Sequence, residues 1–312
     1  MFLNLNKITQ KFDRQGIISN NKAMKDFVIN NPLFREAVEA IDQGRIETLQ
    51  ELLAKHSELV SMRLDSPGEG YFQQPYLLWF VADNPIRHGE LPANIVVISA
   101  LIISKIKEQN LDTLQVQLDY TLGLVVTGST PRNSGVQIEL MDLLIDEGAS
   151  LGRGHGALAH GNIAATQRLL ERGGELTLTT VICLDRWDDV PKLIQTASAT
   201  EAEVALVAAA FFGNVRALTY LLEQGVDPNA YPDPAEGFHS HATALHQAVW
   251  SSSLEAVKVL VEAGARLDLK DKIYEGTPLS WAMYSLTTEE FEDATARERY
   301  RTIAEYLQQQ PG

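Results

Sequence analysis

Residues 243–265 read TALHQAVWSSSLEAVKVLVEAGA, and residues 277–283, which begin 34 positions after Thr243, repeat the opening of that stretch as TPLSWAM. The first seven residues predict a short helix, the serines a turn, and the segment after them an amphipathic second helix. Gly264 follows that second helix directly and is typical of a helix end. The stretch therefore predicts a helix pair that recurs along the chain.

The second-helix pattern occurs four more times upstream. Each copy has two adjacent leucines near the end of the helix, in some copies followed by one more apolar residue. Polar residues come next and end the helix, so we expect the leucines to face inward and the polar residues to face water. The copies are residues 46–55, 138–148, 163–173 and 215–225, and all but the first end on glycine. Several copies over most of the chain predict a solenoid of repeats.

These segments resemble the ankyrin-repeat family, in a divergent, bacterial-type form. Residues 277–282 and 243–248 are similar to the first-helix motif T-P-L-H-x-A of that family. The Gly-Asn pairs at 161–162 and 213–214 resemble its turn between helices, and GVDPN at 225–229 resembles its helix end and the start of its finger. The resemblance implies an all-α fold, an ankyrin-repeat α-solenoid of stacked helix pairs with hairpin or loop fingers.

In this register, residues 31–312 form about eight repeats. Residues 1–30 lack the signature and are expected to form an N-terminal lead or cap, and the charged segment 289–301 is expected to cap the last repeat. Residues 127–135, rich in Gly, Ser and Pro, predict a long turn in the third repeat. In the fifth repeat Trp187 stands where the turn glycine is expected.

The composition narrows the classes of function. Of the residues, 45% are hydrophobic, and the formal net charge of −15 argues against nucleic-acid binding but permits a basic protein partner. The single cysteine, Cys183, excludes an internal disulfide and lies in an apolar run, which predicts a small buried residue. The longest apolar stretch, 95–103, is too short to span a bilayer, and the first ten residues lack the apolar core of a secretory signal. We therefore expect a cytoplasmic monomer without a membrane segment.

The resemblance also places a candidate binding surface. Ankyrin repeats hold partners on a concave face built from finger tips and variable first-helix positions, and in this chain the C-terminal repeats carry aromatic residues there. Exposed aromatic side chains with a polar rim are typical of binding hot spots, although aromatic residues can also fill gaps between repeats. The long finger 231–241 is expected to reach over the concave face. The predicted partner-binding residues are Phe211, Phe212, Tyr231, Phe238, Gln247, Trp250, Tyr274, Trp281 and Tyr284.

Other chemistry has weaker support. His239, His241 and His246, with Asp233 nearby, could in principle hold Zn²⁺. A simpler interpretation is that His246 is the structural histidine of the family, which hydrogen-bonds a neighbouring loop, and that the other two lie on a solvated finger. The sequence contains no phosphate-binding loop and no nucleophile elbow. We expect no catalytic, cofactor-binding or metal-binding residues, and no enzyme.

The leading functional hypothesis is a protein-interaction module, either a scaffold or an inhibitor, with a protein partner on its concave face. Two alternatives stay open at this point. One is a small-molecule or catalytic site hidden in the atypical middle repeats near Tyr120, Cys183 and Trp187, which would require a deep apolar pocket. The other is a stabilising subunit of a larger assembly, which would require a self-complementary apolar patch.

Overall fold

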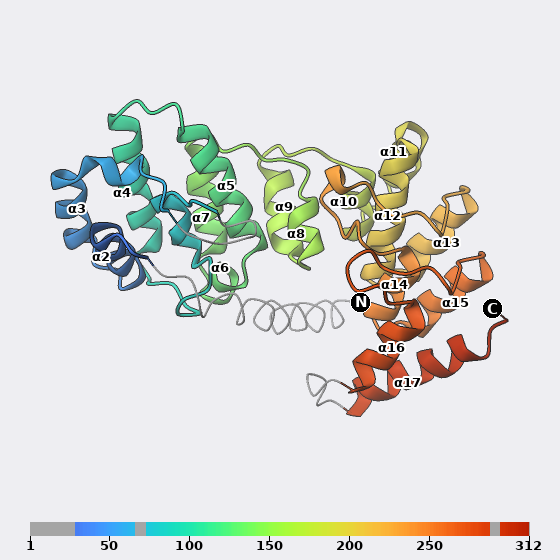
Figure 1. Ribbon diagram of the computed structural model, residues 1–312. Helices are drawn as coiled ribbons and strands as arrows, with labels where there is room; N and C mark the ends of the chain where they lie inside the picture. Colours follow the sequence, from blue (N-terminus) through green and yellow to red (C-terminus); the bar gives the residue numbers. More distant parts are fainter. Residues whose placement is uncertain (1–28, 66–72, 288–293, 312) are drawn as a thin grey trace. The chain divides into compact units, whose positions relative to one another are not determined.

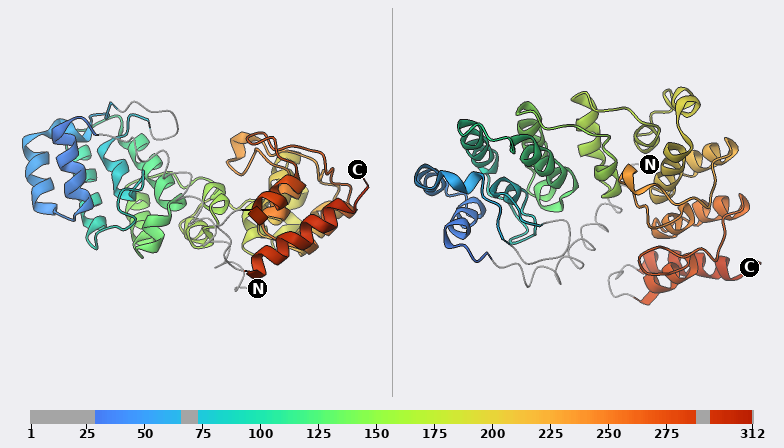
Figure 2. Two further views of the ribbon diagram at one scale, coloured as in Figure 1. Left: turned by 60° about the horizontal axis from the view of Figure 1, so that its bottom comes forward. Right: turned by 45° about the horizontal axis from the view of Figure 1, so that its top comes forward.

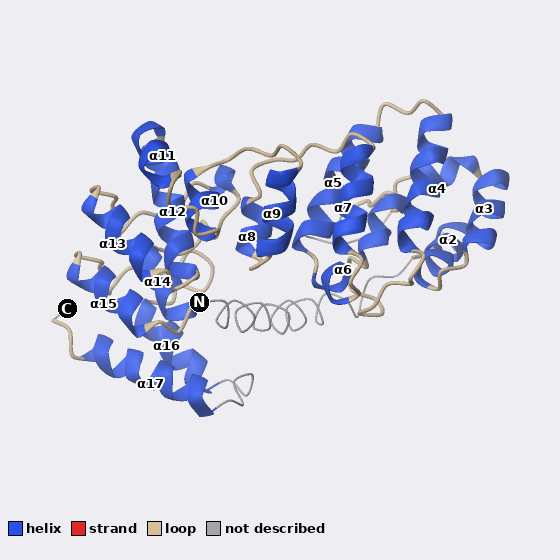
Figure 3. Ribbon diagram, turned by 180° about the vertical axis from the view of Figure 1, so that it is seen from behind, coloured by secondary structure: helices blue, strands red, loops and turns tan. Residues whose placement is uncertain are grey.

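The computed structural model describes residues 29–65, 73–287 and 294–311, and over these ranges it consists of helices, turns and loops without a β-strand (Figures 1 and 3). The all-α prediction is confirmed. The predicted lead 1–30 lies outside the described residues except for Ile29 and Asn30, as does the first part of the predicted cap 289–301. The chain divides into two compact lobes, which are described separately.

The N-terminal lobe comprises the described residues up to 152 together with 168–174. Its helices form three successive pairs, the second of which opens with a 3₁₀ helix instead of an α-helix (Figure 1). The elements are α2 (Pro32–Asp42), α3 (Ile46–Lys55), η1 (Ser57–Val60), η2 (Leu77–Ala82), α4 (Ile95–Glu108), α5 (Leu114–Thr127), α6 (Ser129–Asn133) and α7 (Gln137–Asp146).

The C-terminal lobe comprises residues 153–167 and the described residues from 175 onward. Helix pairs follow one another along it, and connecting segments of different lengths link each pair to the next (Figure 2). The elements are α8 (His155–Ala159), α9 (Ile163–Glu171, whose last residues belong to the other lobe), α10 (Leu178–Cys183), α11 (Val190–Thr196), α12 (Ala199–Phe211), α13 (Val215–Glu223), η3 (Pro234–Glu236), α14 (Ala244–Trp250), α15 (Leu254–Glu262), α16 (Pro278–Thr287) and α17 (Ala294–Gln308).

One short polar residue begins the second helix in three of these pairs. The side chains of Asn162, Asn214 and Ser253 accept hydrogen bonds of 3.2, 3.1 and 3.3 Å from the backbone N–H three residues later. Such a cap satisfies a donor that the first helical turn leaves without a partner. The recurring Gly-Asn or Ser-Ser pair is therefore the turn between the two helices.

Glycines end the second helices where the repeat pattern predicts them. At Gly264, φ is +90°, a backbone conformation that side chains with a Cβ rarely adopt. This geometry lets the N–H groups of Gly264 and Ala265 donate to the carbonyls of Val261 and Leu260 at 3.0 and 2.9 Å. The last turn of the helix is closed and the chain leaves it toward the next finger.

The core of the C-terminal lobe is centred on α12. All eight residues from Val204 to Phe211 are buried, and the helix packs against α10, α13 and α14. Four of the eight are alanines, whose small side chains let neighbouring helices approach closely around Leu206 and Phe211. A helix pair in this lobe therefore buries its apolar side chains against adjacent pairs.

Two local predictions need correction or refinement. Residues 127–135 are not simply a long turn, because α6 forms within them. Cys183 is half-buried, and desolvation raises the pKa of its thiol, which makes it a poor nucleophile at neutral pH. Trp187 is held by the guanidinium of Arg216, whose central carbon lies 3.8 Å from the centre of the indole ring.

We predict that Leu260→Ala lowers the free energy of unfolding by about 2–5 kcal/mol, because Leu260 is fully buried in α15 and its truncation leaves a cavity. Urea unfolding followed by circular dichroism measures the change. Val97→Ala, at a side chain that is 57% exposed, is the control and should change stability by less than about 0.5 kcal/mol. Equal effects of the two substitutions would contradict this description of the core.

Candidate partner-binding surface

The finger before the last helix pair is ordered by one carboxylate. Asp271 is 1% exposed, and its oxygens accept hydrogen bonds from the backbone N–H groups of Ile273, Tyr274 and Gly276 at 2.9, 2.7 and 2.9 Å. The indole Nε1–H of Trp281 in α16 donates to the same carboxylate at 2.9 Å. Asp271 therefore fixes the finger tip relative to the helix that follows it.

These contacts also set the charge of Asp271. Burial alone raises the pKa of this carboxyl, but the hydrogen bonds from Tyr274, Trp281, Ile273 and Gly276 offset that effect, and the pKa lies below its usual value. Asp271 is consequently ionised at neutral pH, and hydrogen bonds to an ionised acceptor are stronger than those to a neutral one.

A histidine ties the same finger to the preceding helix pair. Nε2 of His246 lies 3.0 Å from the carbonyl oxygen of Gly276, and its Nδ1 lies 2.8 Å from the hydroxyl of Thr243. Since a carbonyl only accepts, Nε2 carries the proton and donates it, while Nδ1 accepts from Thr243. The expected structural role of His246 is confirmed. Burial lowers the pKa of His246, which favours this neutral form.

The ordered finger and α16 present large apolar side chains to solvent. Ile273, Tyr274, Met283 and Tyr284 are 60, 76, 43 and 64% exposed, and we call these four residues the exposed quartet. All four lie within twelve consecutive residues of one finger and the helix after it. Isolated exposed apolar residues are ordinary, but several on one finger and one helix are typical of an interaction site.

Three predicted partner-binding residues are instead in the core, and the prediction is wrong for them. Phe211 and Phe238 are 0% and 1% exposed because their rings pack edge to face at 5.5 Å. Gln247 is 2% exposed in α14. Helical position indicated the correct face of α12, but the finger 231–241 covers it.

The remaining predicted residues divide by exposure. Phe212, Tyr231, Trp250 and Trp281 are half-buried, and Tyr274 and Tyr284 are exposed. The Tyr231 hydroxyl donates to the carbonyl of Lys270 at 2.7 Å, and the ammonium of Lys272 lies 4.6 Å from the centre of its ring. Tyr231 therefore holds two fingers together.

The finger histidines are not solvated as predicted. Both His239 and His241 are half-buried, and rings follow one another from Phe211 to His239 at 4.8 Å, to His241 at 5.8 Å and to Trp281 at 6.1 Å. Within the described residues, no group of three or more His, Cys, Asp or Glu side chains is placed to hold a metal ion.

Ile273 and Met283 were not predicted from the sequence. Ile273 stands next to Tyr274 in an extended finger, and an apolar pair at such a tip is a signal that could have identified it. Met283 offered no such signal, because it follows Ala282 in a helix whose apolar residues other than Met283 and Tyr284 are partly or fully buried.

Comparison with models of protein families identifies repeats in part of this chain. Residues 132–271 match the family model described as ankyrin repeats, in three copies. This segment of the chain consists of ankyrin repeats. Among solved structures, the human ASB11 ankyrin repeat domain is similar over 91% of this chain and 100% of that chain, with 15% sequence identity and a TM-score of 0.32. Comparison with curated proteins finds none that matches.

Ankyrin repeats are generally protein-interaction modules, and the fold predicted from the motifs, an ankyrin-repeat solenoid, is confirmed. None of the helices in the described ranges has both the length and the apolar character needed to cross a bilayer.

We predict that Asp271→Asn lowers the free energy of unfolding at pH 7 by about 1–3 kcal/mol, because the amide replaces a charged acceptor of four hydrogen bonds. The folded-state pKa of Asp271 is depressed, so its stabilisation is complete above the unfolded value near 4 and is lost as the pH falls through the folded value.

Urea unfolding at pH 7 and at pH 3 measures this linkage. The difference in stability between the natural chain and Asp271→Asn should shrink at pH 3. A difference that is the same at both pH values would show that the charge of Asp271 does not stabilise the finger.

Proposed function

We propose that this ankyrin-repeat protein is a scaffold or inhibitor that binds a protein partner through the exposed quartet of its last finger and α16. The observation that carries the proposal is the exposure of four large apolar side chains on a finger whose backbone is fixed by a buried carboxylate. Apolar and aromatic residues at the centre of an interface contribute most of its binding energy.

The fixed backbone supports this assignment energetically. Binding costs free energy when loops and side chains lose conformational freedom, and a surface that is already ordered loses less. Because Asp271 and His246 hold the finger before any partner arrives, Tyr274 can be buried without first ordering the loop. The remaining cost is mainly that of fixing the exposed side chains themselves.

The charge of the chain indicates which partner to expect. A net charge of −15 attracts a basic protein and repels an acidic one, and the attraction raises the association rate at low ionic strength. The quartet supplies apolar contact area, while the net negative charge of the chain supplies long-range attraction. The proposed partner is therefore a basic protein that offers apolar side chains to this surface.

We predict that the double substitution Tyr274→Ala/Tyr284→Ala weakens binding by about 30-fold or more, since a hot-spot side chain contributes roughly 2 kcal/mol or more. Affinity capture from extracts of the source cells would isolate the partner, and titration calorimetry with the purified partner at two salt concentrations would measure its affinity. Affinity should also fall as salt rises.

The matched control is Val97→Ala/Val116→Ala, two exposed apolar side chains of the N-terminal lobe, each 57% exposed. This variant should bind like the natural chain. Equal binding by the natural chain, the quartet variant and the control would reject the quartet as the binding surface. Size-exclusion chromatography at two concentrations tests the alternative occupant, a second copy of the chain, and a shift abolished only in the quartet variant would establish self-association instead.

A further inference from the structure

One finger of the C-terminal lobe contacts a helix pair that is not its neighbour. Residues 231–241 connect α13 to α14, yet the ring nitrogen Nε2 of His239 lies 3.0 Å from the carbonyl oxygen of Ala159, at the end of α8. The pairs α10–α11 and α12–α13 come between them in the sequence. In repeat arrays each repeat ordinarily contacts only the ones beside it, so this contact needs a separate explanation.

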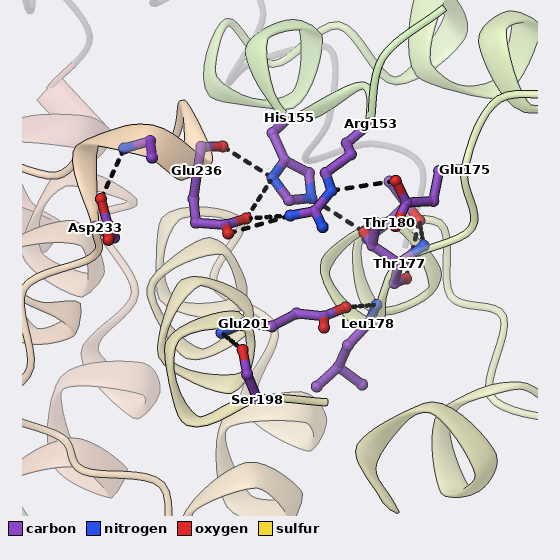
Figure 4. Close-up of polar contacts among 11 residues, drawn as sticks. Arg153, His155, Glu175, Thr177, Leu178, Thr180, Ser198, Glu201, Asp233 and Glu236 are labelled. Carbon is purple, nitrogen blue, oxygen red and sulfur yellow. Dashed lines mark hydrogen bonds and ion pairs between the residues drawn. The ribbon is translucent and has the colours of Figure 1, made fainter. Parts of the chain in front are cut away.

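The tip of the same finger is held at the start of α8 (Figure 4). The guanidinium of Arg153 lies 2.8 Å from the carboxylate of Glu236 and 3.2 Å from that of Glu175. Nδ1 of His155 lies 2.9 Å from the carbonyl oxygen of Glu236, and its Nε2 lies 3.0 Å from the hydroxyl of Thr177. Since a carbonyl only accepts, the neutral ring of His155 donates through Nδ1 and accepts from Thr177.

Apolar contacts fill the space between these two polar anchors. Phe238 is buried against Phe211 at the end of α12, and the ring of His239 lies 4.8 Å from Phe211. Ala159 and Phe211 are first-helix positions that the family resemblance assigns to the concave face. The finger therefore occupies in cis the surface that α8 and α12 would otherwise offer to another molecule.

We propose that residues 231–241 form a strap over the first helices of this lobe, and that the strap opens with the uptake of protons as the pH falls below about 6.5. This inference does not depend on the proposed function, because the exposed quartet lies on a different finger and helix. It follows from the position of His239, whose ring donates to the Ala159 carbonyl while it packs against the rings of Phe211, Phe238 and His241, where a charged imidazolium would lose much of its hydration.

The surroundings of both histidines favour the neutral form. Burial, together with the nearby rings of His241 and His160, lowers the pKa of His239 to about 3, although the bond to the Ala159 carbonyl opposes the shift. Burial also lowers the pKa of His155, although the Glu236 carbonyl and the carboxylates of Glu236 and Glu201 oppose it and Arg153 adds to it. The rings of Phe211 and Phe238 also pack against His239 and carry no charge.

The direction of the pH effect follows from these shifts. An open strap returns His239 to water, where its pKa is about 6.5, so below that pH the open state binds a proton that the closed state does not. The closed strap is thus fully stable above about pH 6.5 and loses stability as the pH falls. For one histidine, the ratio of open to closed straps rises about tenfold between pH 7.5 and 5.5, a range in which Asp and Glu stay ionised.

Amide hydrogen exchange of the full chain at pH 7.5 and 5.5 tests the strap. Protection factors, which are already corrected for the intrinsic effect of pH on exchange, should fall about tenfold at residues 235–242 and stay constant in α15. Unchanged protection in the strap of the natural chain would overturn the proposal. So would an equal fall in α15, because the whole lobe would then be opening.

His239→Gln is the decisive variant, since its amide can still donate to the Ala159 carbonyl but does not titrate. It should lose most of the pH dependence, and a tenfold fall that persists in this variant would overturn the assignment to His239. His88→Gln, at a half-exposed histidine of the N-terminal lobe, is the matched control and should behave like the natural chain.

Arg153→Gln weakens the other anchor without removing a histidine. It should lower protection at both pH values by the same factor and keep the tenfold pH dependence. If His239→Gln leaves the strap unprotected even at pH 7.5, the natural chain and Arg153→Gln provide the test. A tenfold fall in the protection factors of the strap between pH 7.5 and 5.5 in both proteins supports the proposal, and constant protection factors in both overturn it.

Discussion

The fold depends on a limit that applies to every helix pair in the chain: an isolated pair of short helices cannot shield its apolar side chains from water. Leu221 and Leu260 are fully buried because the adjacent pairs cover them, and α12, with eight consecutive buried residues, is possible only between neighbours on both sides. Turn glycines and polar caps then repeat because each pair must close its helices in the same way. The regularity of the sequence reflects this shared requirement.

The fingers carry what is particular to this protein. Asp271 and His246 fix one finger so that it displays Tyr274, while Phe238 and His239 fold another finger back onto the helices. The two fingers have similar kinds of residue and opposite results: one exposes aromatic side chains and the other buries them. Long-range contacts decide which result occurs.

This difference explains how much could be predicted from the sequence. Helix pairs, their ends and the role of His246 follow from patterns within one repeat, such as the spacing of Thr243 and Thr277 or the glycine at 264. The exposure of a side chain cannot be predicted from one repeat, because it depends on segments far away in the chain. Helical position placed Phe211 on the correct face, but whether that face meets solvent is decided by a finger that begins twenty residues later.

Contacts with distant segments also explain which aromatic residues of the candidate surface are exposed. Tyr274 and Tyr284 are exposed because no later finger in the described ranges folds onto them. Trp281, three residues before Tyr284, is half-buried because it donates to Asp271 and lies beside His241 and His246. Residues of one helix that share a face can thus differ in role.

The contact between His239 and Ala159 also restricts how this protein can change over evolutionary time. Repeat arrays commonly gain or lose whole repeats, because each new pair finds the same neighbours as the one before it. Between α8 and α14 this freedom is lost: one additional helix pair would displace Ala159 by roughly 10 Å, the usual spacing of packed helices, and the finger could no longer reach it. This part of the array is therefore fixed in length, whereas pairs outside it can be duplicated or deleted without disturbing the contact.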